Sequence, residues 1–300
     1  MPQHSRLLQH AAETERGHKL SWVFFTLVFG ICKGAREGIK KKALEKSGTF
    51  EVLFLYTLLG FLIVIPTSRN VFDVPNKYYF FIFIKSFLVF LSWICSFTSI
   101  KHMPVGFYGV MDMTRVLFAT LLGITVMGEG TTPRRLGGLA LVLLGLILVN
   151  IHKKGSGENV QPVYIIMTVF SCLLAATSGV MDKWLTKTVT SSQLQFWYML
   201  FMSLMYLAYV AATKTPVRIS TLKTNYWIII LSVIFVIGDR ALFIANSNPN
   251  SYVTVMTLIK QSSVIAAIIA GRVMFGEKGS TRRILCALLI ICGIMLAAVQ

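Results

Sequence analysis

The sequence predicts an all-α membrane protein whose ten transmembrane helices form two inverted five-helix repeats. Two observations predict this fold. The chain is strongly apolar, since 55% of its 300 residues are hydrophobic and only 14% are charged, and one water-soluble core cannot bury that much apolar surface. The second half of the chain also repeats a pattern found in the first half.

The apolar residues fall into stretches that match the thickness of a bilayer. Because an α-helix rises ~1.5 Å per residue, about 20 apolar residues cross a hydrocarbon layer of ~30 Å. Residues that break helices separate the stretches, among them Gly48, Pro104, Pro133, Pro216 and Pro249. In chain order, the predicted helices cover residues 20–43, 49–67, 78–101, 104–127, 134–151, 162–186, 192–212, 225–246, 251–275 and 283–299.

The chain is predicted to divide near its middle. Residues 1–19 are interpreted as a retained polar tail, because no small-residue cleavage site follows a short apolar run. Residues 20–152 make the first five-helix repeat and residues 162–300 make the second. The segment between them, KKGSGENVQ at 153–161, has the composition of a linker.

A constant offset of 148 residues relates the two halves. The segment VMGEGTTPRRLGGLALVLLGLIL (126–148) aligns without gaps with MFGEKGSTRRILCALLIICGIML (274–296), and residues 42–56 resemble residues 183–198 more loosely. Because five is an odd number, two related five-helix units enter a membrane from opposite sides. Carriers that work by alternating access use this inverted repeat.

The repeated Gly-Glu pairs, Gly128-Glu129 and Gly276-Glu277, each close an apolar segment and precede a short polar hinge. In this respect the chain resembles the drug/metabolite transporter superfamily, specifically its ten-helix EamA-type permeases, over residues 20 to 299. The resemblance implies a pseudo-two-fold bundle with a central cavity, and a carrier or exchanger without a pump. It identifies no substrate.

Ionisable residues inside the apolar segments are the main functional signal. A charge near the middle of a bilayer costs ~2.5–3.5 kcal/mol on insertion scales, so such residues usually face the interior of the bundle. The basic ones are Lys33, Arg36, Lys85, Arg115, Arg240 and Lys260, and the acidic ones are Glu37, Asp112 and Asp239. Six cations against three acids leave an excess of three positive charges, which favours an anion in the cavity.

The first helix combines two faces. A GxxxGxxxG pattern from Gly30 to Gly38 suits close helix packing. A separate charged stripe is formed by Lys33, Arg36, Glu37 and Lys40. The stripe has two interpretations. Either it faces a solute, or Lys33 pairs with Glu37 within the helix while Arg36 extends to a membrane surface.

The fourth helix carries Asp112 and Arg115, which are close enough to form an intrahelical pair. The 148-residue offset aligns Asp112 with Lys260, so these two sites carry opposite charges. They are predicted to form a structural bridge between the halves, a gate opened by solute, or neither if they face lipid. Asp239 and Arg240 are adjacent and point about 100° apart in a helix, so different partners are expected for them.

Lys85 stands alone in its helix, and it either extends to the near interface or contributes to a site. Trp93 lies on nearly the same face, where it stacks on a solute or packs against helices. Gln261, beside Lys260, hydrogen-bonds a solute or a neighbouring helix. The candidate substrate-binding residues are therefore Lys33, Arg36, Lys85, Trp93, Asp112, Arg115, Arg240, Lys260 and Gln261.

Several functions are not supported by the sequence. It contains no nucleotide-binding, hydrolase or zinc-protease motif, so we expect no enzyme, cofactor or metal. The net charge of +17 is spread over short loops and apolar segments, which does not indicate nucleic-acid binding. The expected partners are a small-molecule substrate and the lipid bilayer, with a homodimer left open.

These patterns predict a secondary carrier or exchanger for a small anionic or zwitterionic metabolite. The first alternative is an exporter of amphipathic drugs or aromatic amino acids, and the second is a membrane scaffold or lipid-handling protein that transports nothing. We expect a multi-pass protein of the bacterial inner membrane with cytoplasmic termini, as the resemblance implies. Loop charges favour the opposite orientation. With cytoplasmic termini, the outer loops carry more Lys and Arg than the cytoplasmic loops, and cytoplasmic loops usually carry the excess.

Overall fold

The computed structural model describes residues 2–68, 70–127, 133–153, 160–186, 188–246, 253–278 and 280–298, with side chains from Trp22 onward except for some beside the gaps. Within these ranges every regular element is a helix. The helices are α1 (Pro2–Lys46), α2 (Thr49–Val64), the 3₁₀ turn η1 (Ile65–Thr67), α3 (Asn76–Lys101), α4 (Val105–Asp112), α5 (Thr114–Met127), α6 (Pro133–Lys153), α7 (Pro162–Leu185), α8 (Ser191–Thr213), α9 (Thr221–Thr224), α10 (Trp227–Asn246), α11 (Val253–Phe275) and α12 (Ser280–Ala298).

The all-helical class is confirmed, and each predicted apolar segment contains a helix. Five stretches of the described chain are long and apolar enough to cross a membrane by length and composition. The count of ten membrane spans stays a prediction. Those five stretches are Thr49–Thr67, Asn76–Lys101, Val105–Leu122, Pro162–Asp182 and Ser191–Thr213.

Two predicted helices differ from the structure. α1 begins at Pro2, so the segment predicted as a polar tail continues the first helix. The segment predicted as one helix over 104–127 is divided at Met113 into α4 and α5. There the Met113 N–H donates to Val110 O at 3.1 Å, an i→i−3 bond that tightens the backbone locally. No proline or glycine marks this division, so the sequence pattern did not reveal it.

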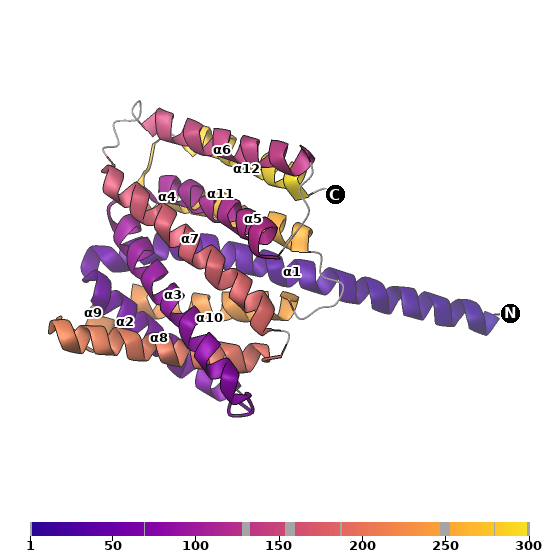
Figure 1. Cartoon of the computed structure of the whole chain (residues 1–300), viewed down its shortest axis with the longest axis horizontal. Coiled ribbons are helices and arrows are strands. Elements are labelled where there is room, and N and C mark those ends of the chain that lie inside the picture. The colour runs from indigo at the N-terminus through magenta and orange to yellow at the C-terminus, as the bar shows by residue number, and fades with distance from the viewer. Residues whose placement is uncertain are drawn as a thin grey trace.

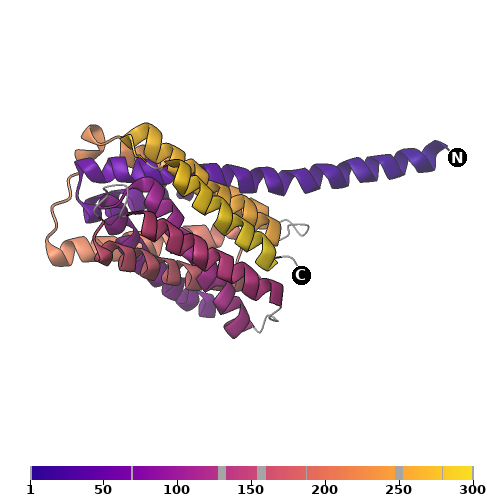
Figure 2. The same ribbon diagram turned by 90° about the horizontal axis from the view of Figure 1, so that it is seen from above.

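The helices pack as a bundle in which partners come from different halves of the sequence. In Figure 1, α6 and α12 lie side by side at one edge, α1 runs between α11 and α10, and α3 crosses α7. Figure 2 shows the same bundle from above, with both chain ends toward the same end of it. α1 and α7 run in opposite directions, so the two related halves enter the bundle from opposite ends.

The packing partners follow the same two-fold relation. α1 contacts α10 and α11, and α7, the first helix of the second half, contacts α3 and α5. α2 packs on α8, and α6 packs on α12, each against its own counterpart. Each half therefore completes its core only against the other half.

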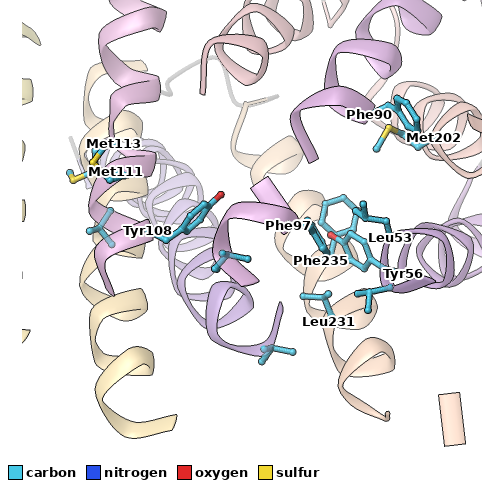
Figure 3. Close-up of a cluster of buried hydrophobic side chains, with 14 of the residues drawn as sticks. Leu53, Tyr56, Phe90, Phe97, Tyr108, Met111, Met113, Met202, Leu231 and Phe235 are labelled. Atoms are coloured by element: carbon cyan, nitrogen blue, oxygen red, sulfur yellow. The ribbon is translucent and has the colours of Figure 1, made fainter. Parts of the chain in front are cut away.

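A buried aromatic and aliphatic cluster fills the space between α2, α3 and α10. Figure 3 shows Leu53, Tyr56, Phe97, Leu231 and Phe235 converging there. All five side chains are buried, and the Tyr56 and Phe235 rings meet edge to face with centroids 5.3 Å apart. Such pairs fix the helix positions through both area and geometry.

Glycines allow the closest approaches between helices. A Cβ atom at Gly34 on α1 would lie 2.5 Å from the Ser263 carbonyl oxygen on α11. At the α6–α12 contact, a Cβ at Gly145 would lie 2.5 Å from Ile290, and one at Gly293 would lie 2.7 Å from the Gly138 carbonyl oxygen. Gly145 and Gly293 are related by the 148-residue offset, so the repeat preserves this close contact on both sides of the pair.

The buried helix α4 is held at its start by the turn between α11 and α12. Gly276 has φ +63°, a left-handed conformation that ends α11 and that glycine adopts without strain. The next residue, Glu277, accepts hydrogen bonds from the backbone N–H groups of Val105 and Gly106, the latter at 3.0 Å. Arg283 Nη1 lies 2.7 Å from the same carboxylate. The counterpart pair Gly128-Glu129 lies outside the described residues.

Candidate functional site

Charged side chains of α1 reach partners on several other helices. Lys33 Nζ lies 3.0 Å from Asp112 Oδ2 on α4, and Arg36 Nη1 lies 3.8 Å from Asp239 Oδ1 on α10. One turn further, Lys40 pairs with Glu37 at 2.5 Å and also donates to Ser96 Oγ on α3. The charged stripe of α1 therefore faces protein on its described length.

This arrangement corrects one interpretation of the first helix. Lys33 does not pair with Glu37, because Glu37 is engaged by Lys40 and Lys33 is engaged by Asp112. Arg36 does not extend to a membrane surface. Its guanidinium carbon lies 5.1 Å above the Phe235 ring, inside the bundle.

Asp112 joins two cations rather than bridging the halves. Its Oδ1 accepts from Arg115 Nη2 at 3.0 Å, which confirms the predicted intrahelical pair, and its Oδ2 pairs with Lys33. The tightened turn at Met113 favours the Asp112–Arg115 pair, because i and i+3 side chains eclipse in 3₁₀ geometry. The predicted bridge or gate pair with Lys260 is not formed, because the ion-pair partners of Asp112 are Lys33 and Arg115.

Asp239 and Arg240 have different partners, as predicted. Asp239 accepts a hydrogen bond of 3.0 Å from the Tyr198 hydroxyl on α8 and faces Arg36. Arg240 donates to Ser192 Oγ at 2.9 Å and to Thr67 Oγ1 at 2.6 Å, toward the ends of α8 and α2. Arg240 is therefore separated from the other candidate cations.

Lys85 is buried in the bundle instead of extending to an interface, with 4% of its surface exposed. Its Nζ lies 3.1 Å from Asp182 Oδ1 on α7 and 4.3 Å from the centroid of the Tyr198 ring. Tyr198 thus touches two ion pairs, with its hydroxyl on Asp239 and its face on Lys85. Cation–aromatic contacts of this kind strengthen when water is excluded.

The candidate residues Trp93 and Gln261 lie against neighbouring helices. The Trp93 ring packs against the Tyr56 ring at 5.2 Å and the Phe235 ring at 5.4 Å, centroid to centroid, so it belongs to the aromatic core. Lys85 lies over the Tyr198 ring and not over Trp93. Gln261 is buried on α11. Its neighbour Lys260 is half-buried, and no carboxylate of the described residues lies within ion-pair distance of it.

Comparisons with known proteins agree with this architecture. The model of the EamA-like transporter family matches residues 20–151 and 162–299, most of the chain. This protein belongs to the EamA-like transporter family. It is therefore an integral membrane protein of the drug/metabolite transporter type, and members of its family are transporters rather than enzymes.

A crystal structure of another protein has the same fold. It aligns with this EamA-family chain at a TM-score of 0.66 over 91% of this chain and 96% of the other, with 14% sequence identity. At that identity the similarity concerns the fold alone. No curated protein sequence matches this chain.

The interior of this EamA-family protein holds two ionisable residues that were not among the predicted interior charges, although one of them, Lys40, belongs to the predicted charged stripe. Asp182 lies near the end of α7 and pairs with Lys85. Lys40 lies near the end of α1 and pairs with Glu37. Listing every ionisable residue within the predicted helices would have found Asp182. The inward direction of Lys40 depends on packing, which the sequence pattern does not give.

The interior charges do not balance. Seven cations (Lys33, Arg36, Lys40, Lys85, Arg115, Arg240 and Lys260) face four carboxylates (Glu37, Asp112, Asp182 and Asp239), which leaves three positive charges in excess. The described residues hold no group of three His, Cys, Asp or Glu side chains arranged for a metal ion. The charged groups of this EamA-family protein are therefore arranged chiefly as ion pairs between helices.

Proposed function

We propose that this protein is a secondary carrier or exchanger that moves a small anionic or zwitterionic metabolite by alternating access. The observation that carries the proposal is the excess of cations in the interior, where no carboxylate of the described residues lies within ion-pair distance of Lys260. A cation inside the bundle without an ion-pair partner is unfavourable, and a bound anion removes that cost.

Two ion pairs join the halves between corresponding pairs of helices. Arg36 of the first half pairs with Asp239 of the second, and Lys85 of the first half pairs with Asp182 of the second. The helix pairs that carry them, α1 with α10 and α3 with α7, correspond under the repeat. Rocking one half against the other must rearrange these contacts, so they are suited to respond to the charge of a solute.

The charges also offer a way for solute to enter the network. The Arg36–Asp239 distance of 3.8 Å is longer than the 3.1 Å between Lys85 and Asp182. A solute carboxylate or phosphate competes with Asp239 for Arg36, and a solute ammonium competes with Lys85 for Asp182. An anionic or zwitterionic metabolite therefore fits the network better than an apolar compound does.

The alternative of an exporter of amphipathic drugs or aromatic amino acids has one feature in its favour, the aromatic cluster around Trp93. Its rings pack on one another, with centroids 5.2 Å and 5.3 Å apart for the Tyr56–Trp93 and Tyr56–Phe235 pairs. A packed cluster supports structure more than ligand binding. The other alternative is a scaffold that transports nothing, and no feature of the described residues favours it over a carrier.

We further propose that the protein lies in a bacterial inner membrane with both termini in the cytoplasm. The position of both chain ends at one end of the bundle supports termini on a common side (Figure 2). A protease-protection assay on inverted and right-side-out vesicles tests the orientation. Cleavage of a tag at either terminus from the outside of cells would contradict it.

The carrier proposal is tested by binding to the purified protein at two salt concentrations. Metabolites that raise its melting temperature should be mostly acidic or zwitterionic. The shift should shrink in high salt, because salt screens the attraction of the charged solute from solution and its anions compete for the cations. Lys260→Gln should weaken these shifts. Lys101→Gln is the matched control, because it removes a positive charge from the exposed end of α3. Hits confined to neutral apolar compounds would overturn the proposal in favour of drug export.

A further inference from the structure

The unbalanced charge is localised at one place in the bundle. Arg36 and Lys85 each have a carboxylate of their own, and each also lies over an aromatic ring, Phe235 or Tyr198. Lys40 likewise has Glu37 and the Phe97 ring. These three cations are balanced, and Arg240 is bonded to hydroxyl groups elsewhere.

Asp112, in contrast, is shared. One carboxylate lies 3.0 Å from both the Lys33 ammonium and the Arg115 guanidinium. Its single negative charge therefore offsets only one of the two positive charges. The Arg115 Nε atom is buried and has no hydrogen-bond partner among the described atoms, so this guanidinium has donor capacity left.

Lys260 lies about one helical turn from the level of this pair. α4 and α11 pack antiparallel, because Gly106 meets Gly271 and Gly109 meets Ala267. One further turn along both helices brings Asp112 to the level of Ser263, so Lys260 lies one turn beyond it on α11. α1 also runs beside α11, with Gly34 against Ser263, one turn past Lys260 on the same face of α11.

Lys33 and Lys260 are close enough to interact electrostatically, as are Lys260 and Asp182. Asp182, however, forms its ion pair with Lys85. Lys33, Arg115 and Lys260, which we term the three-cation cluster, thus have among them only the carboxylate of Asp112, which pairs with Lys33 and Arg115. The cluster lacks two negative charges.

We infer that the three-cation cluster binds a solute that carries two negative charges, a dicarboxylate or a phosphate monoester. The inference rests on the proposed carrier function and narrows its solute class. A dianion brings the local charge to zero and ends the repulsion between the lysines. The Arg115 guanidinium supplies the planar donors that carboxylates and phosphates accept in bidentate fashion, and the lysines act as point charges.

The test compares ligands of similar size that differ by one charge. Succinate and its monoamide form one pair, and methyl phosphate and dimethyl phosphate form the other. The full-length protein is held in nanodiscs of neutral lipid at constant ionic strength and about pH 8, where the monoester carries close to two charges. Calorimetry gives the dissociation constants. The two pairs separate a preference for carboxylate from one for phosphate.

We expect at least one dianion to bind about tenfold more tightly than its monoanionic partner, as one partly screened ion pair provides. Lys260→Gln should remove most of this charge preference, and Lys260→Arg should keep it. Lys101→Gln should change neither constant. If Lys260→Gln fails to fold, the ratio of dianion to monoanion binding in the wild-type protein and in Lys260→Arg still tests the inference.

Equal binding of monoanions and dianions, or binding of neither dianion, would overturn the inference. The carrier proposal is judged separately by uptake into vesicles. Transport of monoanions or zwitterions without a charge preference contradicts only the dianion inference. If vesicles containing the protein move no charged solute at all, the proposed function itself fails.

Discussion

The Tyr198 hydroxyl donates a hydrogen bond of 3.0 Å to Asp239, while the face of the same ring lies 4.3 Å from Lys85 Nζ. One buried side chain therefore connects the Arg36–Asp239 pair with the Lys85–Asp182 pair. Both pairs join the two halves. The position of Tyr198 allows its hydroxyl and its ring to be tested separately.

Tyr198→Phe should lower the free energy of unfolding by about 1.5–3 kcal/mol, the usual contribution of a hydrogen bond to a charged group. Tyr198→Leu should cost more, because it also removes the ring beneath Lys85. Thermal unfolding of the two variants in detergent provides the measurement. Equal losses for both variants would show that the ring beneath Lys85 contributes nothing, and an unchanged stability of Tyr198→Phe would show that the hydroxyl contributes nothing.

The Lys85–Asp182 pair is suited to a double-mutant cycle. Asp182→Asn alone should destabilise the protein by about 3–5 kcal/mol, because it leaves the buried Lys85 ammonium without its partner. Lys85→Met should cost less, because the Asp182 side chain that it leaves is 33% exposed. The double variant should recover much of that loss. The coupling free energy from thermal unfolding measures the effect, and strictly additive losses would show that the 3.1 Å contact carries no interaction energy.

Glu277 should matter for the position of α4. Glu277→Ala leaves the N–H groups of Val105 and Gly106 and the Arg283 guanidinium without this carboxylate, so we expect a loss of about 3–5 kcal/mol. Glu45→Gln is the control, because Glu45 belongs to an exposed pair with Lys42, where the expected loss is at most about 1 kcal/mol. Similar melting temperatures for the two variants would contradict the structural role of Glu277.

Two helical glycines make a matched pair. An alanine at position 34 would place its Cβ 2.4 Å from Ala266 and 2.5 Å from the Ser263 carbonyl, so Gly34→Ala should cost about 1–3 kcal/mol by overpacking. Gly179 on α7 has no atom within 4 Å of an added Cβ. Gly179→Ala should therefore stabilise the helix by about 0.5–1 kcal/mol. If Gly34→Ala melts no lower than wild type, the α1–α11 contact is looser than described.

The sequence predicted the helices better than their partners. Apolar length and helix breakers located the helices closely, because a bilayer imposes its thickness on any segment that crosses it. The division at Met113 was missed, since it follows from a local change in hydrogen bonding rather than from a breaker residue. The extension of α1 to Pro2 was also missed, because a polar helix lacks the apolar pattern that was used.

The candidate site shows the same limit. Burial of Lys33, Arg36 and Lys85 followed from their place in apolar segments, because bilayer hydrocarbon excludes unpaired charge. Their partners did not follow, since Lys33 reaches α4 and Lys85 reaches α7 only through tertiary packing. Local spacing identified the Asp112–Arg115 pair, which lies within one turn. The substrate-binding role of these residues stays a proposal.

Alternating access is tested most directly by counterflow in vesicles that contain the purified protein. Succinate or methyl phosphate, whichever binds, is loaded inside, and entry of the same labelled solute is followed from outside. A carrier predicts entry that saturates and is accelerated several-fold by internal solute, with loss of this acceleration in Lys260→Gln but not in Lys101→Gln. Entry that never saturates and ignores internal solute would contradict a carrier mechanism.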